Sequence, residues 1–500
     1  MTEPYRPNPY LALSGFDPEQ LRGRARRAAQ MLAQISQPNE PRAVRVVGLP
    51  GIGKSSLLHY LHSIHARFLC SPSEHTKAPL RPLQPAFYRE PERLLFMAIS
   101  LKDRPLEMHP FVYLWQQFQA SYLRLRCLVH QSFGRECPDL EMGDTLDRNG
   151  AIDRLKEATR TLKEAWLRPV LLLDDYDLAF AEMDWNETSQ LSPLRDRVAF
   201  IFAGTQPLEV ANPKAAGSPF YATMDPGQLG GLGDIDPVEA DRAARSLITE
   251  TDPEAGPPLE GDDVDLILQL AGNHPHLLAL AAGDLWDLRQ QVGLFTDEAR
   301  RKPLDDRMRR LFEARLATRF APSFRAYWDW LVPEEYRPRW QAHRGDRPMP
   351  GQLLRRLLEK LAVGEELADS EQDEWDTLWR IGLVVKNEQD RPEIFSRLFA
   401  RFVAGLGTPV RQAAPQHEAL YSRVSYLNKK LALLGGEEVQ SVRGKGYRLV
   451  ARADGDDRGI EDPDALGEVG ARIYAFLRRH AGELCTFADL EEAAWSSPIG

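Results

Sequence analysis

The segment GLPGIGKSS, residues 48–56, follows the apolar run AVRVV and precedes a stretch whose leucines recur at helical spacing. It fits the pattern G-x-x-x-x-G-K-[ST], in which a glycine loop joins a buried strand to the first turn of a helix. Glycines let backbone N–H groups approach phosphate closely, and a helix N-terminus favours negative charge. This order of strand, loop and helix predicts an α/β domain that binds a nucleotide at the loop.

The loop contains side chains suited to a triphosphate and its metal ion. Lys54 is expected to reach the outer phosphates of ATP or ADP, and Ser55 to be a ligand of Mg²⁺. An ordinary glycine turn that ends in an exposed lysine is the alternative. The other loop positions expected at the nucleotide are Gly48, Gly51, Gly53 and Ser56.

A second motif, RPVLLLDDYD at residues 168–177, supplies carboxylates. Its continuous apolar run predicts a strand buried on both faces, and acids at the end of such a strand are costly unless they face a cation or a polar cleft. Asp174 is expected to hold Mg²⁺, and Asp175 to orient or deprotonate the attacking water. A strand followed by an acidic turn is the alternative.

Two further apolar runs complete the expected sheet, RLLFMAISL at 93–101 and DRVAFIFAGTQP at 196–207. One lies between the two motifs and the other follows them, which predicts a doubly wound parallel sheet with ligands at the carboxyl ends of its strands. Thr205, at the end of the last run, either senses the γ-phosphate or is a simple strand-end hydroxyl.

Composition excludes several classes of protein. A chain of 500 residues with 43% hydrophobic content is long enough for two to four domains. The polar N-terminus and the lack of a run of about 18 apolar residues predict no membrane span, and therefore a cytoplasmic protein. Four widely spaced cysteines indicate neither a disulfide framework nor a zinc site. The net charge of -10 restricts any nucleic-acid contact to one region.

Together with GLGDIDPVEADRAARSLI and LILQLAGNHPHLLALAAGDLW, these motifs resemble those of STAND-type ATPases, the signalling relatives of AAA+ and origin-recognition ATPases. LRGRARRAAQML at 21–32 is similar to the GR motif of that family, which implies that Arg24 lies near the nucleotide. GNHP at 272–275 is similar to its lid motif, which implies that Pro275 contacts the base and His274 lies near the phosphates. Without the resemblance, a His-Pro pair is a helix-start signal.

The chain also departs from the family. GTQP stands where many members carry an arginine, and Asp175 stands where AAA+ enzymes have a catalytic Glu. Slow turnover is therefore expected, and the resemblance implies a switch that acts through a homo-oligomer or a partner protein. Arg195 and Arg197 are the candidates for an arginine acting in trans.

Beyond the sheet, the segment at 236–248 reads as a helix that Asp236 caps, and the segment at 260–291 reads as two helices. Proline, glycine and acidic residues at 251–263 predict a surface loop, and more helices are expected from 304 to about 332. Residues 374–406 read as a helix, a short strand, a polar turn and a closing strand or helix, which resembles the winged-helix domain of STAND proteins. The expected domains are a lead-in at 1–45, an ATPase core at 46–225, a helical lid at 226–300, a helical and winged-helix-like domain at 301–408 and a C-terminal module at 409–500.

Residues 418–451 read as an amphipathic helix followed by a β-hairpin with the basic turn RGKG. Six Lys and Arg against three Glu give residues 417–450 a net charge of +3. The segment resembles the second half of an OmpR/PhoB-type winged helix, which implies double-stranded DNA as a partner. A protein-docking surface is the alternative. The matching positions are Arg423, Ser425, Asn428 and Lys429 on the helix, and Arg443 and Lys445 on the wing.

Residues 471–495 resemble the first half of the same fold but follow the second half. Ile473, Phe476 and Leu477 are expected to face inward, with Trp495 closing the core. The order indicates a circular permutation, a swap between protomers, or a second copy that is cut short.

Three functions fit these features. The leading one is a STAND-like switch with slow ATP hydrolysis, acting in signalling, transcriptional control or defence. The second is a DNA-loading or transposition-type AAA+ ATPase. The third is a transcription regulator that binds nucleotide without turnover.

Overall fold

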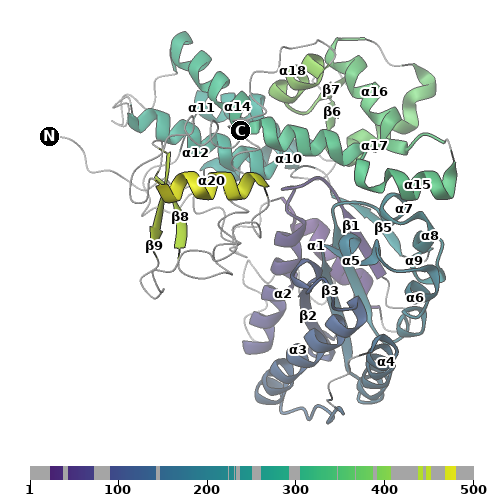
Figure 1. The fold of residues 1–500 in the computed structure, drawn as a ribbon. Helices are drawn as coiled ribbons and strands as arrows, with labels where there is room; N and C mark the ends of the chain where they lie inside the picture. Colours follow the sequence, from purple (N-terminus) through teal and green to yellow (C-terminus); the bar gives the residue numbers. More distant parts are fainter. Residues whose placement is uncertain are drawn as a thin grey trace. The chain divides into compact units, whose positions relative to one another are not determined.

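The computed structural model forms two compact units, Met1–Thr408 and Pro409–Gly500 (Figure 1). Each is described by itself below. No helix in the described part of the chain combines the length and apolarity that crossing a membrane requires. The structure describes residues 23–37, 43–71, 90–141, 143, 147–222, 224–229, 231, 237–249, 259, 261–291, 304–345, 347–365, 368–386, 391–406, 437–442, 446–451 and 468–479.

A parallel sheet of five strands, counted over the described residues, forms the centre of the first unit, in the order β2-β3-β4-β1-β5. The expected doubly wound parallel sheet is therefore present. The strands are β1 Ala43–Val47, β2 Leu94–Ser100, β3 Arg168–Asp174, β4 Ala199–Gly204 and β5 Asp225–Gln228. The first four are the apolar runs predicted above.

Strand β5 was not predicted, because its sequence DPGQ contains no apolar run. It pairs with β1 from Val44 to Val47, so its place in the sheet is set by the neighbouring strand. Strand β5 thus continues the sheet past residue 225, where the sequence placed the end of the ATPase core.

The strand register aligns the two predicted motifs. Ala203 in β4 pairs with Val46 on one side and with Asp174 on the other. Because all these strands are parallel, the loop that follows β1 and the acids that follow β3 leave the sheet at the same edge. Only the width of β4 separates them.

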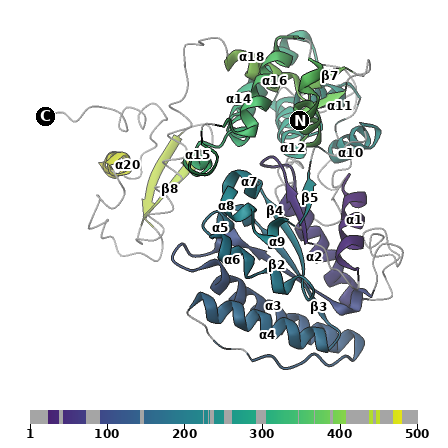
Figure 2. The same ribbon diagram turned by 90° about the vertical axis from the view of Figure 1, so that its right-hand side faces the viewer.

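Helices cover the sheet on both sides (Figures 1 and 2). Helix α2, Lys54–Cys70, contacts β2, β3 and β4. Local signals set the starts of α3 and α4: the His109 side chain accepts a hydrogen bond from the first turn of α3, and the Asp147 side chain does the same for α4. The other helices of this part are α1 Ala25–Ile35, α3 Pro110–Phe133, α4 Arg148–Glu164, α5 Tyr176–Phe180, α6 Trp185–Ser189, α7 Leu208–Ala211, α8 Pro213–Ala216 and α9 Pro219–Ala222.

The helices expected after the sheet are present as α10 Pro237–Thr249, α11 Asp262–Ala271 and α12 Pro275–Gln291. Helix α11 begins at Asp262, so the predicted surface loop ends two residues earlier than expected. The reason is that Asp263 forms a buried ion pair with Arg289 of α12, 2.6 Å apart, which holds the first turn of α11 against α12.

The rest of the first unit follows the predicted order. Helix α14 spans Asp306–Leu331, and α17 is followed by a strand pair, β6 with β7, and by a closing helix. The polar turn is thus followed by both a strand and a helix. The remaining elements are α15 Arg337–Arg344, α16 Pro350–Ala362, α17 Gln372–Arg380, β6 Val384–Lys386, β7 Pro392–Ile394 and α18 Arg397–Leu406.

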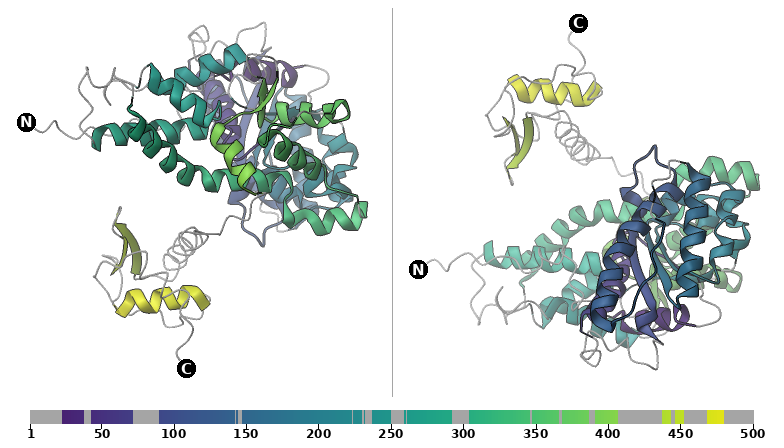
Figure 3. Two further views of the ribbon diagram at one scale, coloured as in Figure 1. Left: turned by 90° about the horizontal axis from the view of Figure 1, so that it is seen from above. Right: turned by 90° about the horizontal axis from the view of Figure 1, so that it is seen from below.

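In the second unit, strands β8 Glu437–Val442 and β9 Gly446–Ala451 form the predicted antiparallel hairpin. Helix α20, Glu468–Arg479, lies beside β9 (Figure 3). The segment expected to be the first half of a winged helix therefore contacts the hairpin of the same chain. Outside the described residues lie the predicted helix at 418–434, Trp495 and the positions proposed for DNA, which are Arg423, Ser425, Asn428, Lys429, Arg443 and Lys445.

One expectation about α20 is wrong. Ile473 and Leu477 are buried as predicted, but Tyr474 is buried and Phe476 is only half-buried. At about 100° per residue, Tyr474 and Phe476 lie equally far from the line through Ile473 and Leu477, on opposite sides of it. Periodicity cannot choose between them, and packing selects Tyr474.

Candidate functional site

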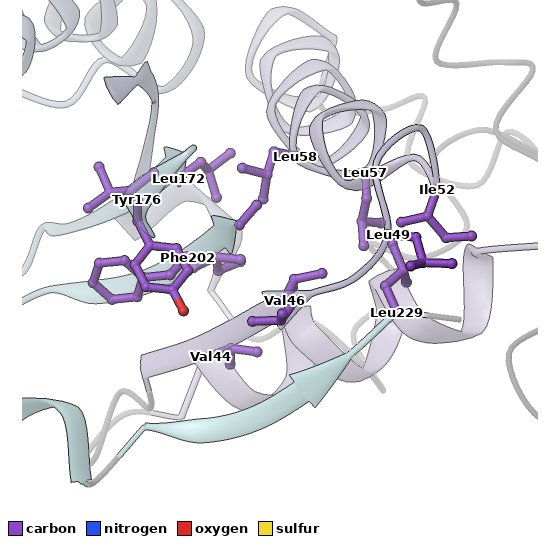
Figure 4. Packing of buried hydrophobic residues seen from close by; sticks show 14 of the residues in the cluster. Val44, Val46, Leu49, Ile52, Leu57, Leu58, Leu172, Tyr176, Phe202 and Leu229 are labelled. Atoms are coloured by element: carbon purple, nitrogen blue, oxygen red, sulfur yellow. The ribbon is translucent and has the colours of Figure 1, made fainter. Parts of the chain in front are cut away.

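The phosphate loop is anchored by its own apolar residues. Leu49 and Ile52 are fully buried, and Figure 4 shows them pointing into the core near Leu57 and Leu229. Gly53, with φ of 97°, lies in the left-handed region directly before α2, where a side chain would be strained. The strand β1, the buried side chains and the start of α2 together hold the loop backbone at the sheet edge.

Lys54 lies at the first position of α2, and its side chain turns back over the loop. The ammonium donates to the carbonyl oxygens of Gly48 at 2.9 Å and Leu49 at 3.0 Å. Burial lowers the pKa of Lys54, and the negative charges of Asp177, Asp174 and Asp175 oppose that shift. The predicted lysine and the predicted acids are thus close enough to interact electrostatically.

The acidic turn after β3 brings several carboxylates together. Asp174 accepts the backbone N–H of Asp175 on Oδ1 at 3.1 Å. Asp175 has a φ of 53°, in the left-handed region, so the chain turns sharply from β3 into α5. Burial raises the pKa of Asp175, and the neighbouring charges of Asp174 and Asp177 raise it further. A carboxylate with a raised pKa is a better proton acceptor than an ordinary one.

Asp177 is a member of this cluster that sequence reasoning missed, although the third acid of DDYD was a signal. Its exposed fraction is 2%, and its Oδ2 accepts the backbone N–H groups of Thr205 at 3.1 Å and Gln206 at 2.8 Å. Burial raises its pKa, and these two N–H groups oppose the shift. Its Oδ1 is buried and accepts no hydrogen bond from any described residue. Asp177 therefore fixes the end of β4 to the acidic turn.

Thr205 lies at the predicted edge, half-buried. Its backbone is held on both sides, since the N–H donates to Asp177 and the carbonyl accepts from the indole N–H of Trp330. The backbone contacts place the Thr205 side chain; they do not decide between the two roles that the sequence left open.

Arg24 lies behind the loop. It is fully buried and donates to the carbonyl oxygens of Ile52 at 3.2 Å and Gly231 at 2.9 Å. Through these two hydrogen bonds, Arg24 joins the loop to the segment that follows β5. The family resemblance implied that Arg24 lies near the nucleotide, which stays a prediction, and nothing local in the sequence indicated Gly231 as its partner.

The first turn of α12 lies against the loop. His274 is fully buried, and burial, followed by the nearby charges of His276, Arg24 and Lys54, lowers its pKa well below the usual range. Pro275 is the first residue of α12, where a missing N–H costs nothing. A Cβ added at Gly51 would lie 2.9 Å from the Cβ of His276. The start of α12 therefore lies at the phosphate loop through His276, and the roles of Pro275 at the base and of His274 near the phosphates stay predictions.

The residues present fit a nucleotide with Mg²⁺. Ser55, exposed on the first turn of α2, offers a hydroxyl, and Asp174 offers a carboxylate at the same edge of the sheet; oxygen ligands of this kind suit Mg²⁺. The 17 residues of α2 direct their N-terminus at the loop. The buried Oδ1 of Asp177, without a donor among the described residues, is a polar atom that a bound group can satisfy.

Arg195 and Arg197 lie just before β4, at the amino edge of the sheet. This is the edge opposite the phosphate loop, so neither reaches the site of its own chain. Arg197 donates to the carbonyl of Lys156 and pairs with Asp196 at 3.6 Å.

A parallel sheet in this strand order, with a glycine loop after β1 and acids after β3, is the α/β fold of P-loop NTPases. Comparisons with protein-family models and with curated proteins find no match. Among solved structures, a Walker-type ATPase of Pyrococcus abyssi is 12% identical over 81% of this chain and 99% of that chain, with a TM-score of 0.41.

Two proteins of Aeropyrum pernix are also similar. The ORC2 protein, in ADPNP–ADP complexes, is 10% identical over 77% of this chain and 93% of that chain, with a TM-score of 0.37. The ORC1 protein, in complex with DNA, is 14% identical over the same shares, with a TM-score of 0.32. Each of these TM-scores lies below 0.5, and the fold of this chain is shown by its own strand order and contacts.

Proposed function

We propose that this chain is an ATP-dependent conformational switch of the STAND type with slow hydrolysis. The observation that carries the proposal is the convergence at one sheet edge of the Lys54 ammonium, the acids of DDYD and the first turn of α12. A phosphate-binding lysine, metal-binding and basic carboxylates and a covering helix are the parts that such a switch needs.

Each residue has a role that follows from its position. Lys54 leaves the carbonyls of Gly48 and Leu49 to bind the outer phosphates, while Ser55 and Asp174 hold Mg²⁺. Bound Mg²⁺ would supply positive charge that neutralises the phosphates. Asp175, with its raised pKa, orients the attacking water and accepts its proton.

Slow turnover follows from two features. Asp175 is one methylene shorter than the glutamate of AAA+ enzymes, so its carboxylate reaches less far towards a water at the γ-phosphate. The first turn of α12 packs on the loop at Gly51, so a change in the loop backbone also requires a change in α12. A lid that contacts the loop directly should slow the release of a bound nucleotide and therefore its exchange.

The decisive experiment measures ATP hydrolysis with and without duplex DNA, together with the mass of the particle in ADP and in ATP. Assembly that requires ATP alone, with slow hydrolysis, supports the switch. Hydrolysis stimulated by DNA supports the loader in its place. Sequence-specific DNA binding without turnover supports the regulator. Failure of the wild-type chain to bind any nucleotide would refute all three.

A second activity, DNA binding by the C-terminal unit, is favoured by the antiparallel pairing of β8 with β9, which the sequence reading of a winged helix required. If Arg443 and Lys445 contact phosphates, replacing both with alanine should make the plot of log Kobs against log salt shallower by about 2, at roughly 0.9 per contact. Fluorescence anisotropy of labelled duplex DNA at several salt concentrations measures this slope.

The matched control replaces Arg478 and Arg479 with alanine, which removes the same charge from the end of α20. It should leave the slope unchanged. An unchanged slope in the Arg443→Ala, Lys445→Ala variant would favour a protein-docking surface.

A further inference from the structure

The end of helix α14 is joined to the end of β4 by a reciprocal pair of hydrogen bonds. The indole N–H of Trp330 donates to the carbonyl of Thr205, and the side-chain amide of Gln206 donates to the carbonyl of Trp330 at 2.6 Å. The exposed fraction of Gln206 is only 6%. Because the pair is partly buried, separating it leaves the buried amide of Gln206 without its partner, which favours the two bonds forming and breaking together.

The same helix also contacts the start of α12, which packs on the phosphate loop. The hydroxyl of Tyr327 lies 2.9 Å from Nε2 and 3.4 Å from Nδ1 of His274, and His276, two residues later, lies against Gly51 of the loop. A neutral imidazole has one donor and one acceptor nitrogen, so the ring can accept from the Tyr327 hydroxyl. Burial lowers the pKa of His274 well below its usual range, which keeps the ring neutral.

These two contacts reach both sides of the proposed phosphate position. His274 and His276 lie at the start of α12, which packs on Gly51 of the loop that holds Lys54, and Thr205 and Gln206 are held by Asp177 of the acidic turn. Between the loop and the acidic turn there is only β4, as the register shows. A nucleotide that moves the loop or the end of β4 must therefore strain or release at least one contact with α14.

We infer that Tyr327 and Trp330 form a two-point latch through which helix α14 reads the state of the nucleotide site. His274 and Gln206 are its positioning residues: His274 joins Tyr327 to the start of α12, which packs on the phosphate loop, and Gln206 joins the end of β4 to Trp330. The inference rests on the proposed function and adds the element that carries the signal away from the site. A nucleotide can shift α14 only if the latch differs between the ADP and ATP states, and this difference can be measured.

The test uses the full chain and two variants that remove one latch contact each. Tyr327→Phe removes the hydroxyl that faces His274, and Gln206→Met removes the amide that faces Trp330 while leaving the backbone N–H bonded to Asp177. Each should accelerate dissociation of a fluorescent ADP analogue on the order of 10-fold, the effect of one lost hydrogen bond. In the wild type, the rate of amide hydrogen exchange at residues 324–332 should differ between the ADP-bound and the ATPγS-bound protein. In either variant this difference should be smaller.

Arg355→Met is the matched control. Arg355 donates to the carbonyl of Trp328 at 2.9 and 2.6 Å and thereby joins α14 to α16, away from the nucleotide site. The variant should lose thermal stability but keep the wild-type rate of ADP dissociation. If it accelerates dissociation as much as the latch variants, general loosening of α14 explains their effect and the inference is wrong.

The double variant tests whether the two contacts act on one element. If they do, the effects of Tyr327→Phe and Gln206→Met on dissociation should be non-additive. Equal protection of residues 324–332 in ADP and ATPγS, in a wild-type protein that binds both, would refute the latch and leave the switch standing. A wild type that binds neither nucleotide would instead refute the proposed function.

Discussion

Replacing Lys54 with methionine is expected to abolish nucleotide binding. Methionine keeps most of the volume of a side chain that is only 7% exposed, so the loop and α2 should keep their packing. The variant lacks the ammonium that would bind the outer phosphates. The three acids at the same edge then repel the phosphates, and no lysine charge opposes this repulsion. Losing at least one charge-assisted contact of about 3 kcal/mol weakens binding on the order of 100-fold or more.

Isothermal titration with ADP and with Mg²⁺-ATP measures this effect, after circular dichroism has established that the variant is folded. Lys102→Met is the control, because Lys102 is an exposed lysine close enough to lower the pKa of Asp175. It should bind within about threefold of the wild type, since exposed charges interact weakly through water. Wild-type affinity in Lys54→Met would show that the phosphates bind elsewhere.

Replacing Asp175 with asparagine should stop hydrolysis and leave binding intact. The amide has the shape of the carboxylate but cannot accept a proton from the attacking water. Asparagine also tolerates the left-handed conformation at φ of 53°, so the turn into α5 should be preserved. Loss of a general base lowers kcat by about 100- to 10,000-fold.

Single-turnover hydrolysis of ATP measures the chemical step, and the titrations described for Lys54 measure binding. Asp175→Glu is the informative companion, because it keeps a carboxylate and supplies the longer side chain of AAA+ enzymes. It should retain hydrolysis within about tenfold of the wild type, or exceed it. If the Asp175→Asn variant hydrolyses ATP at the wild-type rate, Asp175 is not the general base, and Asp177 becomes the candidate for that role.

Much of the nucleotide site is encoded in short stretches of sequence. The left-handed glycines of the loop, the apolar strand that ends in Asp174 and the proline at the start of α12 are local signals, each produced by the conformational preferences of a few neighbouring residues. The carboxyl ends of parallel strands lie at the same edge of a sheet, so the residues that follow different strands come close together. For this reason Lys54 and Asp174 could be assigned to one edge without coordinates.

Other features depend on contacts between residues far apart in the chain. Strand β5 forms because β1 offers an unpaired edge, although DPGQ has no strand pattern of its own. Arg24 finds its carbonyl partner 207 residues away at Gly231. The choice of Tyr474 over Phe476 in α20 is of the same kind, since two equivalent positions on a helix are distinguished only by what packs there.

The sequence by itself determined the parts on which the proposed chemistry rests: a glycine loop, the acids that follow a buried strand, and the strands that place both. Only the tertiary structure decided how that chemistry connects to the rest of the chain, through Asp177 and the contacts of α14 with Thr205, Gln206 and His274. The physical reason is that backbone preference acts over a few residues, whereas a hydrogen bond between Trp330 and Thr205 exists only after two separately formed elements have packed.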